Sequence, residues 1–491
     1  MTSETPSGAR TGADYLAGLS GESREVWMGG QQIDDVVGHP LLGGGACAMA
    51  GWFDWCLDHA ESCLYASPTS GLPVNISHLQ PTSRDELVRR GKGLRTMAEY
   101  HGGLMGRAPD YLNVTFALFA ARHDVWARYG NEQGAENLVR YHELCRERDL
   151  STTHAIMNPQ SDRTKADADA GGGDVALHKV GECAEGIIVS GARMVATLAP
   201  YADEITIYPG SPLRREDTRY ALCFGIPMST PGLKVVLRDS YAKPRSLYDA
   251  PLSSRFDEQD GLVIFNDVVV PWDRIFLDGD TRLYDEVISH TNWRAHIIHQ
   301  AMTRAWTKLE LTFGLAHAIA EMTGVNGFDH VQEKLGELWS YVELTRSGIL
   351  AAEQGSFQAE GCSDWVPDQR SLVALRGQMP KWIPRAFELT RLVGGAGFMA
   401  TPSYLDMHGP LGPELDRYLQ ARGGTSEQRV RLFRLAWDMI GSDLGSRGEL
   451  YERFYLSDSF RMTALAYVMA DKTGPLALVD RFLSEPPDAG H

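Results

Sequence analysis

The pattern of hydrophobic and polar positions divides the chain into three stretches, and the first is mostly helical. Thr82 or Ser83 can cap a helix whose first turn is acidic and which continues towards Tyr100. A second helical pattern covers residues 114–129. We therefore expect residues 1–150 to form an N-terminal, mostly helical domain.

The middle stretch, residues 151–279, changes to short runs of β-branched and aromatic residues separated by turn residues. The runs are residues 186–191, 204–208, 220–224, 234–237, 262–265 and 268–270. Such spacing is typical of strands in a compact antiparallel β domain. Residues 167–174 are rich in Asp, Ala and Gly, which indicates a flexible insert.

The last stretch, residues 280–491, is helical again. Apolar residues recur there at spacings of three, four and seven, which places them on one helix face: Val331, Leu335, Leu338, Val342 and Ile349. Residues 294–322, 371–392 and 427–440 are further long helix candidates. Four long helices in series predict a bundle.

Charge and cysteine content narrow the classes of protein. The formal net charge of the 491 residues is -17, which disfavours binding to nucleic acid or to an anionic membrane surface. Residues 1–14 lack the basic and apolar pattern of a signal peptide, and no apolar run approaches the roughly 18 residues that span a membrane. The seven cysteines include no CxxC pair, so we expect free thiols in the cytoplasm and no structural metal.

Four segments carry candidate chemistry, and the first is residues 106–113. Arg107 and Tyr111 stand four residues apart around Pro109, which restricts the residue before it and shapes the backbone. The two side chains can converge on one small anion. The alternative is a surface arginine paired with Asp110 and a tyrosine that only packs.

The other three segments mark the junctions between the stretches. Residues 151–163 contain His154 with hydroxyl, amide and charged side chains, at a domain junction where ligands commonly bind. The small side chains in residues 191–204 would let a flat ring approach the backbone closely. Residues 445–455 begin with flexible residues and continue as a charged helix. The alternatives are a hydrogen-bonded junction histidine, an ordinary strand connection and a solvated helix face.

Together and in this order, the four segments resemble the 4-hydroxyphenylacetate 3-monooxygenase family, the large components of two-component flavin monooxygenases. Shorter matches are residues 24–27, 39–40, 224–228, 230–232 and 393–397. The resemblance spans about residues 15 to 480.

The resemblance implies an α+β chain with the acyl-CoA dehydrogenase-like fold. Its parts are an N-terminal helical domain, a middle antiparallel β-barrel domain and a C-terminal four-helix bundle. It further implies a homotetramer that binds reduced FAD between the β domain and the bundle. The partners are then O2, a phenolic substrate and a separate NAD(P)H:flavin reductase.

The resemblance also implies roles for particular residues. Arg107, Tyr111 and His154 surround the phenolic oxygen, and His154 also borders the cofactor. The remaining implied cofactor contacts are Gln160, Arg163, Thr197, Ser446 and Arg447, with Thr197 near the reactive flavin nitrogen. Ser211 lies where the family reads the tail of the substrate.

These residue types suit hydroxylation of a phenol ortho to its hydroxyl group. A phenol attacks an electrophilic oxygen best as phenolate, so its oxygen needs positive charge and hydrogen-bond donors. Arg107 provides a permanent charge, Tyr111 a donor and His154 a base that titrates near neutral pH. The site must also exclude water so that oxygen is not lost as hydrogen peroxide.

Departures from the family pattern leave the substrate open. Ser446 and Gly448 stand where the family often has Gly and His, and the loop at residues 208–217 has its own composition. A small phenolic acid, a halogenated phenol and a carrier-bound tyrosine-like group all fit.

Three other classes of protein are alternatives to a phenol hydroxylase. A 4-hydroxybutyryl-CoA dehydratase needs cysteine ligands for an iron–sulfur cluster, and none lies near Arg107. An acyl-CoA dehydrogenase would leave Arg107, Tyr111 and His154 without a purpose. A non-catalytic flavin-binding protein would not need the motif set. No GxGxxG fingerprint occurs, which fits a flavin that is reduced elsewhere.

Overall fold

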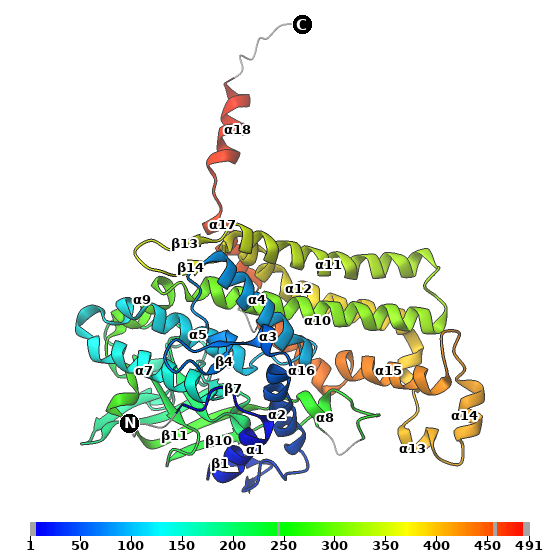
Figure 1. Cartoon of the computed structure of the whole chain (residues 1–491), viewed down its shortest axis with the longest axis horizontal. Coiled ribbons are helices and arrows are strands. Elements are labelled where there is room, and N and C mark those ends of the chain that lie inside the picture. Colours follow the sequence, from blue (N-terminus) through cyan, green and yellow to red (C-terminus); the bar gives the residue numbers. More distant parts are fainter. Residues whose placement is uncertain (1–5, 243–245, 455–458, 485–491) are drawn as a thin grey trace.

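The computed structural model describes residues 6–242, 246–454 and 459–484, and Tyr455, in the fourth candidate segment, lies outside them. The N-terminal region is mostly helical, as predicted (Figure 1). Its helices are α1 (Gly12–Gly21), α2 (Gly43–Asp58), α3 (Ala60–Cys63), α4 (Arg84–Tyr100), α5 (Pro109–Ala121), α6 (His123–Trp126) and α7 (Glu132–Arg148). The small hairpin β3 (Leu64–Ala66) and β4 (Pro73–Asn75) lies between α3 and α4. Ser83 caps α4 by accepting a hydrogen bond from the Glu86 amide.

The middle region contains two sheets. Their strands are β1 (Glu25–Met28), β2 (Gln31–Ile33), β5 (Thr152–His154), β6 (His178–Glu182), β7 (Gly186–Thr197), β8 (Glu204–Ile207), β9 (Leu222–Pro227), β10 (Leu233–Leu237), β11 (Asp260–Pro271) and β12 (Ile275–Asp278). One sheet has the order β2-β1-β10-β11-β7-β6 and the other β12-β9-β8-β5. All six predicted strand runs fall wholly or partly within strands, and residues 262–265 and 268–270 belong to one strand, β11, with a bulge between Phe265 and Val268.

The middle region is the expected β domain, in which most strand pairs are antiparallel. Within the described residues the strands form two separate sheets, and the pairs β1–β10 and β5–β8 are parallel. The strands β1 and β2 also come from the stretch expected to be helical. Val26 and Met28 of β1 are buried while their neighbours are not, so this four-residue strand extends the sheet core. A strand this short gives too little alternation to stand out in the sequence.

The predicted insert at residues 167–174 is a 3-10 segment, η3 (Asp167–Gly173), with left-handed glycines at Gly171 and Gly172. It belongs to the long connection between β5 and β6.

The C-terminal region contains the four predicted long helices. These are α10 (Trp293–Thr323), α11 (Asp329–Gln354), α12 (Gln369–Gly394) and α15 (Ser426–Ile440). The predicted apolar face of α11 is buried along its length. Helix α10 packs against α11, α12 and α15 on one side and against α4 and α5 of the N-terminal region on the other. It thereby joins the bundle to the helices that precede the candidate site.

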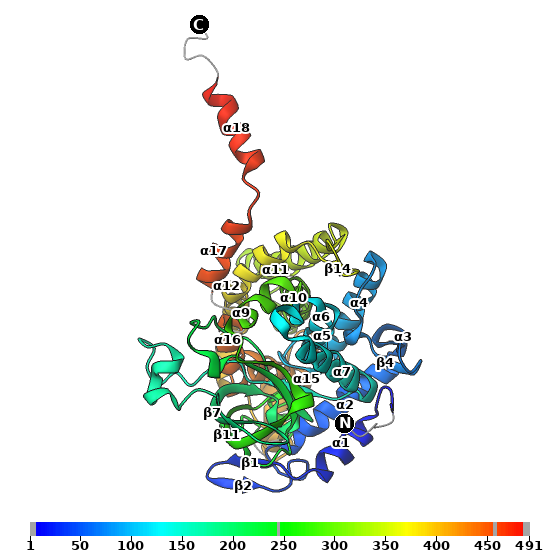
Figure 2. The same cartoon turned by 90° about the vertical axis from the view of Figure 1, so that its left-hand side faces the viewer.

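Shorter elements complete the C-terminal region. They are α9 (Thr281–His290), β13 (Phe357–Gln358), β14 (Trp365–Val366), α13 (Tyr404–Met407), α14 (Gly412–Tyr418), α16 (Asp443–Phe454), α17 (Ser459–Met469) and α18 (Thr473–Leu483), while the short α8 (Ser253–Phe256) lies in the middle region between β10 and β11. Helix α17 packs on α12. Helix α18 stands clear of the rest of the molecule in both views (Figures 1 and 2), and it has no buried residue.

Candidate active site

The structure brings Arg107, Tyr111 and His154 together. Arg107 lies two residues before α5, next to the N-cap residue Ala108, and Pro109 at the first helical position keeps Ala108 out of the helical conformation. Tyr111 lies in the first turn of α5, and His154 is the last residue of β5. The residues are brought together because α5, with the segment before it, packs against β5.

The contacts in this cluster are direct. The Nε atom of Arg107 donates a hydrogen bond of 2.7 Å to Nε2 of His154. The guanidinium carbon of Arg107 lies 4.0 Å from the centre of the Tyr111 ring, and the Tyr111 and His154 rings meet edge to face at 5.7 Å. Only 8%, 5% and 3% of Arg107, Tyr111 and His154 are exposed. The alternative of a surface arginine paired with Asp110 is therefore wrong, and the Asp110 carboxylate instead accepts a hydrogen bond from Gln300.

Burial sets the ionisation of the groups around the cluster. Burial, reinforced by the neighbouring Arg107 charge, holds the pKa of His154 well below its ordinary value. Burial also raises the pKa of Asp110 to about 6, although Gln300 and Arg304 oppose the rise. His154 is consequently a neutral imidazole beside a permanent cation.

A second set of contacts links the cluster to β7 and α16. The Arg107 backbone amide donates to Oε1 of Glu258 at 2.8 Å, and Arg447 of α16 donates to Oε2 of the same carboxylate at 2.6 Å. Arg447 also donates to both carboxylate oxygens of Asp260. The Thr197 hydroxyl, at the end of β7, donates to Asp260 at 2.8 Å. Burial alone would raise the pKa of Asp260, but Arg447 and Arg238 lower it well below its usual range.

Two of the implied cofactor residues, Thr197 and Arg447, therefore belong to one hydrogen-bonded network. The network also contains Glu258 and Asp260, which the sequence analysis did not single out. They flank the left-handed Gln259 at the start of β11, where Asp260 pairs with Thr197 in the strand register, so their roles arise from the fold and not from a sequence pattern.

Four other residues with implied roles lie outside the buried cluster. Gln160, Arg163, Ser211 and Ser446 are all exposed. Their roles stay predictions, because the described contacts do not place them on the phenol-oxygen cluster.

Tyr208 is a further residue of the site that the sequence analysis missed. Its hydroxyl is hydrogen-bonded to Nδ1 of His154, and the side chain is 1% exposed. It ends the predicted strand at residues 204–208 and begins the loop at residues 208–217, so the sequence pattern assigns it no role of its own.

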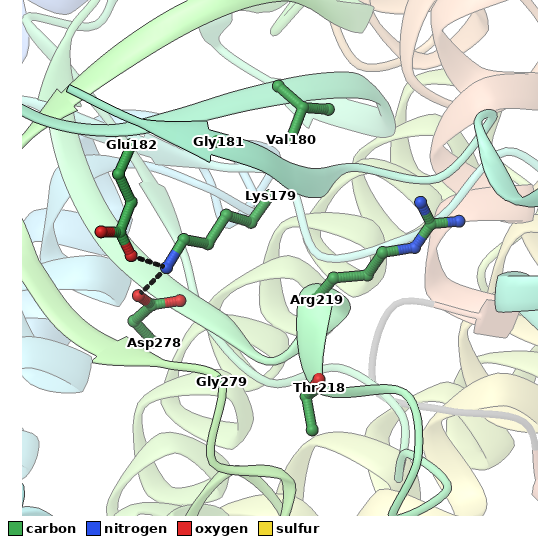
Figure 3. Close-up of a pocket in the computed structure, with 8 residues that line it drawn as sticks. All are labelled: Lys179, Val180, Gly181, Glu182, Thr218, Arg219, Asp278 and Gly279. Atoms are coloured by element: carbon green, nitrogen blue, oxygen red, sulfur yellow. Dashed lines mark hydrogen bonds and ion pairs between the residues drawn. The ribbon is translucent and has the colours of Figure 1, made fainter.

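Two surface cavities are lined by none of the predicted site residues. One, of about 570 Å³, lies beside β6 and is drawn in Figure 3. Its Lys179 ammonium is held between Glu182 and Asp278, so this cation is already neutralised. The other, of about 820 Å³, is lined chiefly by residues from α7 and the α5–α6 connection.

The described residues contain no group of three or more His, Cys, Asp or Glu side chains arranged to hold a metal ion. None of the helices described is both long and apolar enough to cross a bilayer. The seven cysteines are all free thiols.

The fold and this buried cluster define the class: an oxygenase component of the flavin-dependent aromatic monooxygenases. The chain belongs to the 4-hydroxyphenylacetate 3-hydroxylase family. The N-terminal model of that family matches residues 11–277 and the C-terminal model matches residues 285–484.

Individual relatives agree over nearly the whole chain. The 4-hydroxyphenylacetate 3-monooxygenase oxygenase component of Thermus thermophilus is 37% identical over 97% of this chain and 98% of its own length. The 4-nitrophenol 2-monooxygenase oxygenase component of a Rhodococcus species is 32% identical over 91% of this chain and 86% of its own. A solved 4-hydroxyphenylacetate 3-monooxygenase oxygenase component, complexed with FAD and 4-hydroxyphenylacetate, superposes with a TM-score of 0.92. That structure is 37% identical, and the match covers 97% of this chain and 99% of the other.

The rival dehydratase shares the fold. A solved 4-hydroxybutyryl-CoA dehydratase from N. maritimus superposes with a TM-score of 0.88 at 19% identity, covering 98% of this chain and 96% of the other. At that identity the likeness concerns the fold alone. The chemistry must be argued from the side chains.

Proposed function

We propose that this chain hydroxylates a phenol ortho to its hydroxyl group, using reduced FAD and O2. The observation that carries the proposal is the buried contact of Arg107, His154 and Tyr111 beside the Thr197–Asp260–Arg447 network. A fixed cation, a neutral imidazole and a phenol hydroxyl in one closed cluster suit the binding of a phenolic oxygen.

Within the cluster, each residue has a task. Arg107 stabilises the negative charge that develops on the phenolic oxygen, since an opposite charge nearby favours the ionised form. His154 accepts the phenolic proton, and Tyr111 orients the oxygen. Burial of all three keeps water from the reacting carbon.

The residues between β7, the β5–β6 connection and α16 fit a bound flavin. Because the Thr197 hydroxyl donates its hydrogen to Asp260, its oxygen is left to accept a hydrogen bond from a ring N–H. The exposed Gln160, Arg163 and Ser446 suit a dinucleotide with an anionic pyrophosphate. All three nitrogens of Arg447 already serve Asp260 and Glu258, so Arg447 holds this framework. When bound, reduced FAD together with O2 supplies the electrophilic oxygen atom.

The assembly that we propose is a homotetramer served by a separate NAD(P)H:flavin reductase in the cytoplasm. The free cysteines suit a reducing compartment. The apolar α18 supports assembly, because Leu476, Val479 and Phe482 are more than half exposed on a helix that contacts no core. The absent dinucleotide fingerprint supports a separate reductase.

One panel tests the function. The purified chain, a flavin reductase, NADH, FAD and O2 are incubated with a phenolic acid, a halogenated phenol, a nitrophenol and a carrier-bound tyrosine. We expect mass spectrometry to show the gain of one oxygen atom on at least one phenol, with the new hydroxyl ortho to the first. Ser211 in the exposed loop after β8 would select among them by contacting the tail of the substrate.

The panel also separates the proposal from a non-catalytic flavin protein. If O2 consumption is recovered entirely as hydrogen peroxide with every phenol, and none gains oxygen, the proposed function is wrong.

A further inference from the structure

We propose that Tyr208 is a positioning residue that fixes the tautomer of His154, with the proton on Nδ1 and the Nε2 lone pair turned towards Arg107 of the proposed phenol site. The inference rests on the proposed function, and it adds a residue to which neither the motifs nor the family resemblance assigned a role. Tyr208 acts on the phenol through His154.

The fold holds Tyr208 at this place. Strands β5 and β8 run parallel with His154 opposite Thr206, so the residue two positions after Thr206 emerges from the same end of the sheet. The Tyr208 ring packs edge to face against Phe116, Phe119 and Trp293, with ring centres 5.8–6.5 Å apart. Such packing leaves the hydroxyl group in one position beside His154.

Donor and acceptor chemistry then fixes the proton on the imidazole. The Nε atom of a guanidinium always carries hydrogen, so the bond from Arg107 requires Nε2 of His154 to be an unprotonated acceptor. A neutral imidazole has one N–H, which must therefore be on Nδ1. This N–H donates to the Tyr208 oxygen. Arg107 and Tyr208 thus select the same tautomer from opposite sides of the ring.

This arrangement matters when a phenol binds. As the phenolic O–H bond breaks and the proton moves to Nε2, the Arg107 Nε–H gives up its bond to Nε2 and donates instead to the phenolate oxygen, on which the electron pair stays. The net charge of the site is unchanged. The new imidazolium keeps its Nδ1–H bond to Tyr208, and a hydrogen bond to a charged group is stronger than one to a neutral group. Tyr208 therefore makes His154 a better acceptor of the phenolic proton.

Few groups compete for this proton. The titratable or charged side chains with described contacts to His154 are Arg107 before α5, Tyr111 on α5 and Tyr208 after β8. The carboxylate of Glu258 is one contact further from His154, because it accepts a hydrogen bond from the Arg107 backbone amide. The effect of Tyr208 on ionisation is thus exerted through the Nδ1 hydrogen bond.

The test compares Tyr208→Phe with Tyr141→Phe. Tyr141 is a matched control because it is fully buried in the same aromatic cluster, with its ring 5.3 Å from Phe116, and its hydroxyl does not contact His154. The probe is 4-nitrophenol, whose phenolate absorbs visible light. Difference spectra at a fixed pH, at which the free probe is un-ionised, give the ratio of ionised to un-ionised bound probe without any turnover.

We expect Tyr208→Phe to lower that ratio by about tenfold, the size of one lost hydrogen bond to a charged group. Tyr141→Phe should leave the wild-type ratio. Combined with His154→Ala, Tyr208→Phe should add nothing, since its effect passes through the imidazole. Melting curves of each variant check that the fold is retained.

Either of two results overturns the inference. One is an unchanged ratio of ionised to un-ionised probe in Tyr208→Phe with the probe bound. The other is loss of probe binding in the folded variant, which would make Tyr208 a direct substrate contact. Because the readout is ionisation of a bound probe, it succeeds or fails independently of whether any phenol is hydroxylated.

Discussion

The chemistry of the site depends on a few individual side chains that are buried almost completely. Arg107 serves two functions at once, since its side chain bonds to His154 and its backbone amide bonds to Glu258. A lysine could supply the charge but has no Nε–H fork to serve both the imidazole and a phenolic oxygen. Residue identity at position 107 therefore matters beyond its charge.

Replacing His154 with Ala removes the acceptor for the phenolic proton. We expect the hydroxylation rate to fall by about a hundredfold, the usual contribution of a positioned acid–base group, with hydrogen peroxide replacing the product. Product yield and peroxide yield measured together give the result. His290→Ala, on the exposed end of α9, is the control. Wild-type rates in His154→Ala would remove the histidine from the mechanism.

A second prediction concerns Glu452, a buried carboxylate on α16 that receives hydrogen bonds from Arg304 and Lys308 of α10. Glu452→Gln leaves two buried cations without their counter-charge, and breaking such a pair typically costs about 3–5 kcal/mol. We expect urea unfolding at neutral pH to show a loss of that order. Glu449→Gln, at the more exposed neighbouring position, should change stability little.

The pH dependence of this effect follows from the ionisation of Glu452. Burial would raise its pKa, but Arg304 and Lys308 together lower it from 4.5 to about 2. A lowered pKa contributes stability that is complete above the unfolded value and is lost as pH falls through the folded value. The difference between wild type and Glu452→Gln should therefore narrow as pH falls from 4.5 towards 2. A difference that widens over this range would contradict the assignment.

At the scale of elements, α16 holds the active-site loop in place. Its Arg447 and Tyr451 lie one turn apart with the guanidinium over the ring at 4.2 Å, and the Tyr451 ring packs on Gly106, next to Arg107. A Cβ atom at position 106 would lie 2.3 Å from that ring. Glycine is required there by the close approach of helix and loop.

We predict that Gly106→Ala lowers hydroxylation by at least tenfold while the helices remain formed. The added methyl must push apart Tyr451 and the loop, and small displacements of positioned groups cost large factors in rate. Steady-state rates and circular dichroism measure the two effects. Gly314→Ala is the control, because a Cβ there meets nothing within 4 Å. Unchanged activity in Gly106→Ala would show that the loop is adaptable.

The long elements could be predicted from the sequence because their signals are local. The apolar face of α11 and the cap at Ser83 repeat within a few residues of each other. Arg107, Tyr111 and His154 were found because they stand in recognisable segments. Tyr208, Glu258 and Asp260 could not be found in that way, since each acquires its role from a partner between 54 and 189 residues away or from the pairing of strands. Tyr208 meets His154 only because β5 and β8 pair in parallel.

The whole molecule carries an apolar arm that its own core does not use. Removing residues 471–491 should leave the subunit folded, because α18 has no buried residue, and should weaken the tetramer, because the exposed apolar residues are lost. Light scattering at micromolar concentration gives the mass, and circular dichroism checks the fold. A truncated chain with the same mass distribution as the full chain would assign assembly to the bundle faces alone.

The complete chain should also be unable to oxidise NADH by itself. It lacks the glycine fingerprint that binds a dinucleotide pyrophosphate at a helix N-terminus. NADH absorbance should stay constant when the chain is mixed with FAD and NADH, and should fall once a flavin reductase is added. Rapid oxidation without the reductase would give this chain a second active site.

The short distance along the chain between Tyr208 and the exposed loop that follows has a consequence for how this enzyme can evolve. Tyr208 is buried and bonded to His154, whereas Ser211 and Arg214 are already at the surface. In the proposed function Ser211 contacts the tail of the substrate, so substitutions from position 211 onward would change which tail is accepted and would leave Tyr208, three residues earlier, unaltered. Directed evolution restricted to residues 211–216 is then expected to alter selectivity without first losing catalysis.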